Sequence, residues 1–337
     1  MLAQRGPFDV LLKRFLEPAD RSTDKLSESL LRRLFRHRRL NADAGPCAED
    51  PCLRCLALHL PRVRYFVRAR RPVHFLLPAF PAKSPSRRKT LGPLPDRAEE
   101  VALDYLKDVC REISEIYDPG IRVTLCSDGH VFGDVVGVSD DDVSAYGAEM
   151  RDMLHRQKHY AVDWFDLSDA YEVRDYNTIR ERLTVDYARS LEEVEDRARR
   201  FDHARSIFNG IHRFIVEEQV DVQPGLSKTK LREACKKRAF QVIQRSEAWS
   251  RLLADCFPAA LRLSIHPQSP HSEKIGILLG EADDAWVTPW HGVAVRTSSG
   301  WRFMKRGEAE ASGARRVDRN GRPSHYERID GGEGVPR

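Results

Sequence analysis

The sequence predicts an α/β protein with a doubly wound, Rossmann-like and mostly parallel sheet, a charged helical segment, and C-terminal strands that include a hairpin. Short apolar runs of strand length alternate with segments of helical period from residue 61 onward. Residues 178–255 are highly charged and follow a helical pattern, and Asn320–Gly321 separates two strand-like arms. That dipeptide favours a type I′ hairpin turn because both of its residues need positive φ.

The chain divides into three predicted regions. Residues 1–60 form an N-terminal helical segment with a cysteine cluster, residues 61–177 form the βαβ half of the Rossmann-like domain, and residues 178–330 complete that domain with a helical insert and strands. In the first region, residues 1–16 and 24–40 predict amphipathic helices. We interpret the arginine-rich face of the second helix as solvated.

The βαβ half starts with a strand at residues 73–80 ("VHFLLPAF"). Residues 95–120 follow with helical period and acidic residues in the first turn, and residues 121–129 return to a strand pattern. A helix at 141–157 and a strand at 160–171 repeat the order. Such units pair their strands in parallel through right-handed crossovers.

The helical insert has one predicted break, at residues 221–230 ("DVQPGLSKTK"). Apolar runs after it predict further strands at residues 260–268, 274–280, 286–297 and 300–306. Pro323 predicts an edge position for its arm of the hairpin, because proline cannot donate to a neighbouring strand.

Composition excludes several classes of protein. The 337 residues are 41% hydrophobic, no apolar run is long enough to cross a membrane, and the net charge of +5 is spread along the chain. We therefore expect a cytoplasmic protein with neither a nucleic-acid nor a membrane partner. A basic α/β module that binds RNA stays open as the non-enzymatic alternative.

Seven cysteines in a chain of this length fit reduced thiols better than a disulfide framework. Cys47, Cys52, Cys55 and His59 have a C-x4-C-x2-C-x3-H spacing that offers four ligands for zinc. We prefer the simpler interpretation, a loop and helix start with reduced thiols and no metal. A zinc-stabilised scaffold without catalytic activity is a further alternative.

Ligands of open parallel sheets bind beyond the carboxyl ends of the strands, which here points to the loops at residues 78–95, 127–134, 168–171 and 265–272. The first loop contains Lys83, Arg87, Arg88 and Lys89 among prolines that fix the backbone, so it predicts a cradle for phosphate or carboxylate. Partial burial would lower the pKa of Lys83 and make its amine basic or nucleophilic.

Acid and base candidates occur in the other loops. Asp128, His130 and Asp134 combine carboxylates with an imidazole that can move a proton near neutral pH, and His266 follows a predicted strand. His291 adds a proton carrier. Its neighbour Trp290 offers an aromatic face for a substrate or, equally, a side chain for the core. The Walker A, G-x-G-x-x-G, H-E-x-x-H and G-x-S-x-G motifs are absent.

Six strings in these regions resemble the isonitrile (isocyanide) synthases of the pyoverdine and dityrosine biosynthesis family. They extend over about residues 47–327 and are "LPAFPAKSPSRRKTLGPLPD", "CSDGHVFGDVVGV", "FNGIHRFIVEE", "VIQRSEAWSRLL", "LRLSIHPQ" and "DAWVTPWHGVAVR". Ser86 departs from the pattern, because we expect asparagine there.

The resemblance implies an enzyme without a cofactor. It would join the α-amino group of an aromatic L-amino acid, tyrosine in preference to tryptophan, to ribulose 5-phosphate, whose C2 becomes the isonitrile carbon. An iron and 2-oxoglutarate dependent oxygenase is the expected partner that acts on the product. A relative that forms an N-formyl amino acid is the alternative within the family.

The resemblance also implies roles for individual residues. Lys83 would contact the sugar by a charged hydrogen bond or a transient Schiff base, and His130 and His266 would carry protons. Further residues are expected to bind substrate or phosphate: Ser84, Arg87, Arg88, Asn209, His212, Arg213, Arg245, Ser246 and Trp290. Asn209 and Arg213 lie four residues apart on a predicted helix and share a face.

Overall fold

The computed structural model describes residue 15, residues 20–41, residue 47, and residues 51–328 except 174, 283, 285 and 286. The predicted helix at residues 1–16 therefore lies almost entirely outside the described residues. The predicted helix at residues 24–40 is observed as α2 (Arg21–Phe35), which starts and ends earlier than predicted. The side chain of Asp20, just before it, accepts hydrogen bonds from the N–H groups of Ser22 and Thr23.

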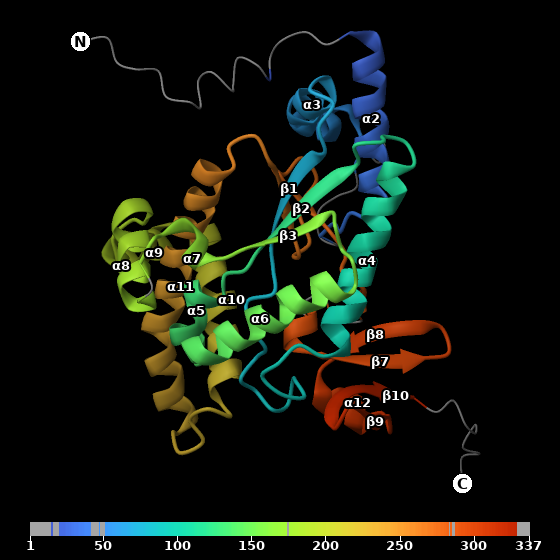
Figure 1. Cartoon of the computed structure of the whole chain (residues 1–337). Coiled ribbons are helices and arrows are strands. Elements are labelled where there is room, and N and C mark those ends of the chain that lie inside the picture. The colour runs from blue at the N-terminus through green and yellow to red at the C-terminus, as the bar shows by residue number, and fades with distance from the viewer. Residues whose placement is uncertain are drawn as a thin grey trace.

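The central sheet has five parallel strands in the order β3-β2-β1-β4-β5 (Figure 1). Its strands are β1 (Val73–Pro78), β2 (Ile121–Cys126), β3 (Val162–Phe165), β4 (Leu261–Ser264) and β5 (Lys274–Gly276). The chain adds strands on one side of β1 as far as β3 and then continues on the other side with β4. This reversal confirms the predicted doubly wound arrangement.

Helices cover both faces of the sheet because β1 buries apolar side chains in both directions. Phe75 and Leu77 join one apolar core, whereas Leu76 joins another on the opposite face. The first face packs against α2 (Arg21–Phe35), α3 (Leu53–Arg68), α4 (Arg97–Ser114) and α6 (Asp140–Arg156). The second packs against α5 (Gly129–Val136), α7 (Leu167–Ala170), α8 (Tyr176–Tyr187) and α11 (Lys228–Cys256).

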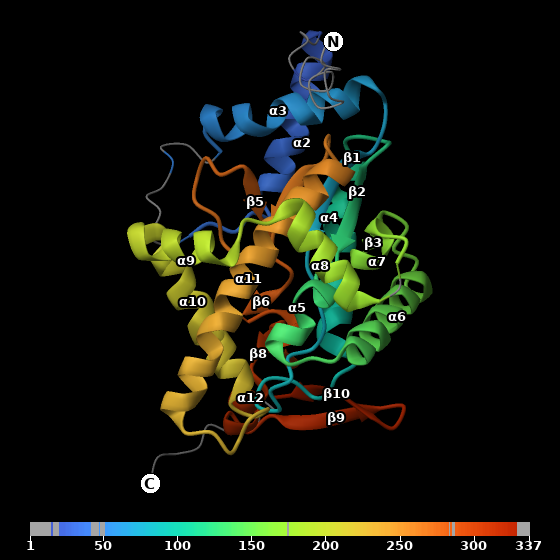
Figure 2. The same cartoon turned by 90° about the vertical axis from the view of Figure 1, so that its left-hand side faces the viewer.

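The charged insert is helical as predicted, but it is interrupted more often than expected. Besides the predicted break, short non-helical connections separate α8 from α9 (Leu191–Arg200) and α9 from α10 (Asp202–Gln219). Ser190 starts α9 with a capping box that includes Glu193. In Figure 2, α10 and α11 lie side by side, and Ile215 and Leu231 pack between them.

The C-terminal strands form a second sheet rather than an extension of the first. This mixed sheet has the order β6-β8-β7-β10-β9 and packs against α4, below the central sheet in Figure 1. Its elements are β6 (Glu281–Ala282), η1 (Pro289–His291), β7 (Val293–Thr297), β8 (Gly300–Met304), α12 (Arg306–Ala311), β9 (Arg315–Arg319) and β10 (Arg322–Glu327). Asn320 and Gly321 have φ values of 51° and 74°, which confirms the predicted hairpin turn.

Two sequence expectations are wrong. β10, which contains Pro323, is not the edge strand, because it lies between β7 and β9; Pro323 is tolerated since only Tyr326 and Glu327 pair with β7. The boundary predicted after residue 60 falls inside α3, which continues through Pro61. Among the described helices, none combines the length and apolar character that a membrane span requires.

Candidate active site

The sheet order reverses between β1 and β4, and ligands of such sheets bind where the loops after these two strands diverge. The loop after β1 contains Phe80 as its second residue, which is fully buried and has a φ of 57°. A bulky residue with positive φ is strained, and such strain gathers at functional sites. Phe80 packs on Trp290, with ring centroids 5.0 Å apart. The loop thereby meets η1 at the reversal point.

The loop after β2 is joined tightly to the loop after β1. Ser127 Oγ donates to the carbonyl of Phe80 over 3.0 Å. At Gly129, a Cβ atom would lie 2.0 Å from the carbonyl oxygen of Pro81, so only glycine fits this approach. The "SDG" string is thus required by the contact between two loops at the carboxyl edge of the sheet.

Lys83 is completely enclosed. Its ammonium lies 2.9 Å from Asp96 Oδ2 and 2.8 Å from Glu99 Oε2, and it donates to the carbonyl of Pro289 over 3.0 Å. Burial alone would lower the pKa of Lys83, but the two carboxylates raise it above its usual value. The expected depressed pKa is therefore wrong. With no exposed surface, Lys83 holds η1 in place and does not reach into solvent.

The two carboxylates were missed because Asp96 and Glu99 form the capping box of α4. Their backbone contacts explain their presence in the sequence, so nothing marked them as partners of a lysine. Burial, the largest influence, raises the pKa of Glu99 to about 7 although Lys83 opposes the shift. Tyr146 donates its hydroxyl to Glu99 Oε1 over 3.1 Å.

The rest of the loop is joined to α10. Ser84 Oγ and Lys89 Nζ both donate to the buried carboxylate of Glu218. Ser86, where asparagine was expected, donates to Asp221 Oδ2 over 2.6 Å. Lys89 also lies 5.4 Å from the centre of the Phe214 ring.

The loop cations consequently do not form one cradle. Lys83 and Lys89 are buried with carboxylates, because a cation without a counter-ion is costly to bury. Arg87 and Arg88 are exposed at the surface. Arg88 pairs with Asp221 over 3.3 Å, and within the described part of the chain Arg87 has no ionic partner.

Two predicted histidines belong to elements at the reversal point. His291 in η1 lies against Thr288 Oγ1 at 3.1 Å and meets the Phe214 ring edge-on at 5.2 Å. Burial, followed by the charges of Lys89 and His266, lowers the pKa of His291 well below its usual value. Although the His266 side chain is exposed, the protein around it and then Arg39 lower its pKa to about 4. Both shifts favour the neutral form of the imidazole, which lowers the basicity of the ring as well as its charge.

Asp128 lies at the end of β2, and its side chain does not cap α5. Burial raises the pKa of Asp128 to about 7, so the carboxyl exchanges a proton near neutral pH. The acid or base role of Asp128 stays a prediction.

His130 is occupied by other contacts. Nδ1 lies 3.3 Å from Asp140 Oδ1, Nε2 lies 3.3 Å from Ser144 Oγ, and the ring stacks on Tyr176 at 3.5 Å. Burial lowers its pKa. Arg180 binds Asp140 with both terminal nitrogens, at 2.8 and 3.0 Å, and donates to the His130 carbonyl. Sequence reasoning missed this network, because Arg180 and Asp140 lie 40 residues apart and no local pattern marks them as partners.

The remaining predicted residues do not gather in one place. Arg245 donates to Asp134 Oδ1 over 2.6 Å, which joins α11 to α5 and leaves neither charge unpaired. His212 Nε2 contacts the carbonyl of Arg232 at 2.8 Å and so links α10 to α11. Trp290 is 2% exposed and belongs to the core. Three other predicted residues are exposed on helices, namely Asn209, Arg213 and Ser246.

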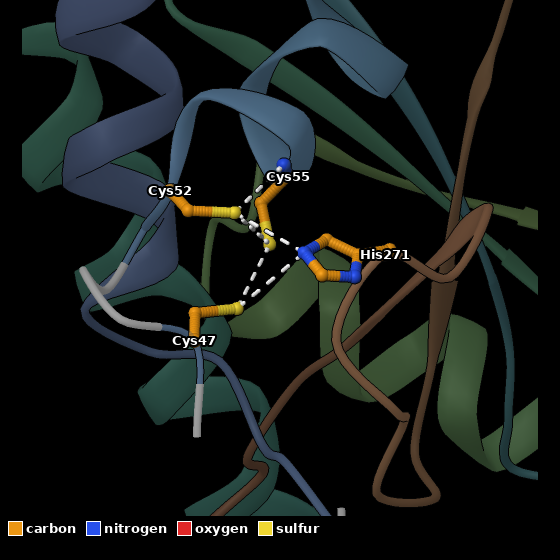
Figure 3. Close-up of side chains that lie close together, drawn as sticks. All are labelled: Cys47, Cys52, Cys55 and His271. Carbon is orange, nitrogen blue, oxygen red and sulfur yellow. Dashed lines mark hydrogen bonds between the residues drawn. The ribbon is translucent and has the colours of Figure 1, made fainter. Parts of the chain in front are cut away.

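The three predicted cysteines lie together, but the histidine beside them is His271 and not the predicted His59. Cys47, Cys52 and Cys55 surround the imidazole of His271, a residue of the loop after β4 (Figure 3). His59 is buried beside Phe35 instead, with ring centroids 5.9 Å apart. A histidine distant in sequence could not be found from local spacing.

Replacing Asp128 with asparagine should flatten the pH dependence of stability between about pH 4 and 7. The folded pKa of about 7 exceeds the unfolded value, so the folded protein binds more protons and its stability falls as pH rises through this range. The difference in free energy of unfolding between the variant and the unmodified protein should be on the order of 2 kcal/mol more favourable to the variant at pH 7.5 than at pH 4.5. Urea unfolding at both pH values measures this, with Asp118→Asn, an exposed carboxylate, as control. Equal slopes for both variants would contradict the assignment.

Comparison with known proteins places the whole chain in context. Residues 63–317 match the family model described as pyoverdine/dityrosine biosynthesis protein. An L-tryptophan isonitrile synthase of Fischerella ambigua is 47% identical over 301 residues, which cover 89% of this chain and 91% of that protein. An L-tyrosine isonitrile synthase of Pseudomonas aeruginosa is 40% identical and covers 90% of this chain and 94% of its own length.

Comparison with a solved structure gives the same result as comparison of the sequences. The crystal structure of the PvcA protein from Pseudomonas aeruginosa superposes with a TM-score of 0.82 at 40% identity, covering 90% of this chain and 99% of that one. The chain belongs to the pyoverdine/dityrosine biosynthesis family.

Proposed function

We propose that this protein is an isonitrile synthase that condenses the α-amino group of an aromatic L-amino acid with ribulose 5-phosphate, whose C2 becomes the isonitrile carbon. The observation that carries the proposal is the 47% identity to an L-tryptophan isonitrile synthase over nearly the full length of both chains. The neutral histidines at the reversal point of the sheet support it. The product would pass to an oxygenase that uses iron and 2-oxoglutarate.

Tryptophan is the first amino acid to test. The two L-tryptophan isonitrile synthases of Fischerella ambigua are 47% and 42% identical to this chain, whereas two L-tyrosine isonitrile synthases are 40% and 36% identical. These values favour tryptophan over the tyrosine expected from the resemblance. The preference for tyrosine stays a prediction that a direct comparison of the two substrates decides.

The reaction needs groups in different protonation states, and we assign the candidate residues to its steps on that basis. Condensation of an amine with a ketone needs a base that takes the amine proton and an acid that assists the loss of water. His266 and His291 are our candidates for the base, and Asp128, with a pKa of about 7, for a group that serves in either form. Arg87 and Arg88 remain proposed contacts of the phosphate, where guanidinium groups bind in bidentate fashion.

The purified protein, incubated with ribulose 5-phosphate and either tryptophan or tyrosine, should form a product with the infrared stretch of an isonitrile. Ribulose 5-phosphate labelled with carbon-13 at C2 should shift that band, because the labelled carbon enters the isonitrile group. An N-formyl amino acid as the only product, or a band that the label does not move, would overturn the proposal. Omission of either substrate is the control.

A further inference from the structure

Three thiols and one imidazole meet at a point near the N-terminal end of α3 (Figure 3). The ligand atoms of Cys47, Cys52, Cys55 and His271 all lie within 4.8 Å of one another. Sulfur–sulfur separations are 3.6 Å from Cys47 to Cys55 and 3.7 Å from Cys52 to Cys55. His271 Nε2 lies 3.6 Å from the Cys47 sulfur and 3.1 Å from the Cys52 sulfur.

These four of the six separations are close to the edges of a zinc tetrahedron. With zinc–sulfur bonds of about 2.3 Å and zinc–nitrogen bonds of about 2.0 Å, tetrahedral angles put two sulfurs about 3.8 Å apart and a sulfur and a nitrogen about 3.5 Å apart. A disulfide would instead need sulfurs at about 2.05 Å and could use only two of the three thiols. The cluster therefore matches the geometry of a metal site and not that of a cross-link.

The surroundings support the same set of ligands. The backbone N–H of Cys55 donates to the Cys52 sulfur over 3.4 Å, as expected for the start of a C-x2-C ligand pair. Such outer contacts orient metal ligands and balance the charge of a thiolate group.

His271 is held in an unfavourable backbone conformation, with a φ of 64°. Residues other than glycine adopt this region in only about a few per cent of cases, although asparagine, aspartate and histidine are enriched there, so the conformation has a cost that its surroundings must offset. Its ring is directed at the three sulfurs in Figure 3. A bond from Nε2 to a metal would supply that compensation.

We propose that Cys47, Cys52, Cys55 and His271 bind one Zn²⁺ in a closed structural site. Four protein ligands leave no position for a substrate, which distinguishes the site from a catalytic zinc centre. It joins the N-terminal part of the chain to the loop between β4 and β5, the loop that also carries His266. Backbone contacts reinforce this junction, since Arg39 accepts from Gln268 over 3.0 Å and donates to Gly276 over 2.9 Å.

Zinc measured by mass spectrometry in protein purified without chelator should approach about one ion per chain. In His271→Ala the zinc content should fall roughly tenfold or more. Loss of an outer contact already weakens metal affinity by about 10–100-fold, and loss of a ligand should weaken it further. His271→Cys restores a fourth ligand and should regain zinc. Cys256→Ser, which removes an exposed cysteine outside the cluster, is the matched control and should keep it.

Cobalt provides a second measurement that does not depend on the folding of any variant. Protein freed of zinc and titrated with Co²⁺ should develop the intense absorption of tetrahedral cobalt bound by thiolates. The proposal is overturned if unmodified protein contains no zinc and gives no such absorption, or if His271→Ala retains as much zinc as Cys256→Ser. An isonitrile synthase that lacks zinc would refute this inference alone, whereas a zinc protein without synthase activity would refute only the proposed function.

Discussion

Replacing Lys83 with alanine should lower the free energy of unfolding by about 3–5 kcal/mol, the usual effect of removing one partner from a buried ion pair. The substitution would leave the carboxyl groups of Asp96 and Glu99 buried without a cation, and both contact Lys83 within 3 Å. The loss should grow as pH rises above about 4, because the folded protein must then keep protonated two carboxyls that ionise freely in the unfolded chain. Chemical denaturation at pH 5 and pH 8 measures both the size and the trend.

Arg87→Ala is the matched control, because it removes a positive charge from the same loop at an exposed site. Its effect on stability should stay within about 0.5 kcal/mol. A Lys83→Ala protein as stable as the control but inactive would contradict the positioning role and favour direct contact between Lys83 and the sugar. A protein that is unstable at pH 8 and largely recovered at pH 5 would support the buried triad.

The fold could be predicted from the sequence where local patterns decide the structure. Strands β1 and β2 are apolar runs bounded by turn residues, and the Asn320–Gly321 turn depends only on the two residues that form it. The separate second sheet was not predictable in this way. The pattern of a strand predicts that a segment pairs with another strand, but it does not identify that strand. Whether the C-terminal strands extend the first sheet or form a second one depends on their contacts with α4.

The site was predicted less completely, and the reason is electrostatic. Sequence position placed Lys83 and His266 at the correct edge of the sheet, but it could not show which charges face one another. Lys83 meets Asp96 and Glu99 only because α4 begins at the end of its loop, and Arg245 meets Asp134 across 111 residues of chain. His271 lies 216 positions after Cys55 in the sequence (271 minus 55), yet its side chain lies beside the three cysteines in the folded chain. Partners at such separations carry no local signature.

His291→Ala should reduce turnover by about 100-fold or more, the usual contribution of a group that transfers a proton in the rate-limiting step. Burial lowers the pKa of the imidazole, which contacts Thr288 at 3.1 Å and lies in η1, the element that Lys83 holds through the carbonyl of Pro289. His266→Ala should have an effect of similar size if the two rings share the proton transfers. His203→Ala, an exposed histidine at the start of α10, is the control and should leave turnover unchanged. Near wild-type turnover in both His266→Ala and His291→Ala, with folding intact, would remove the histidines from the mechanism and leave Asp128 as the group to test.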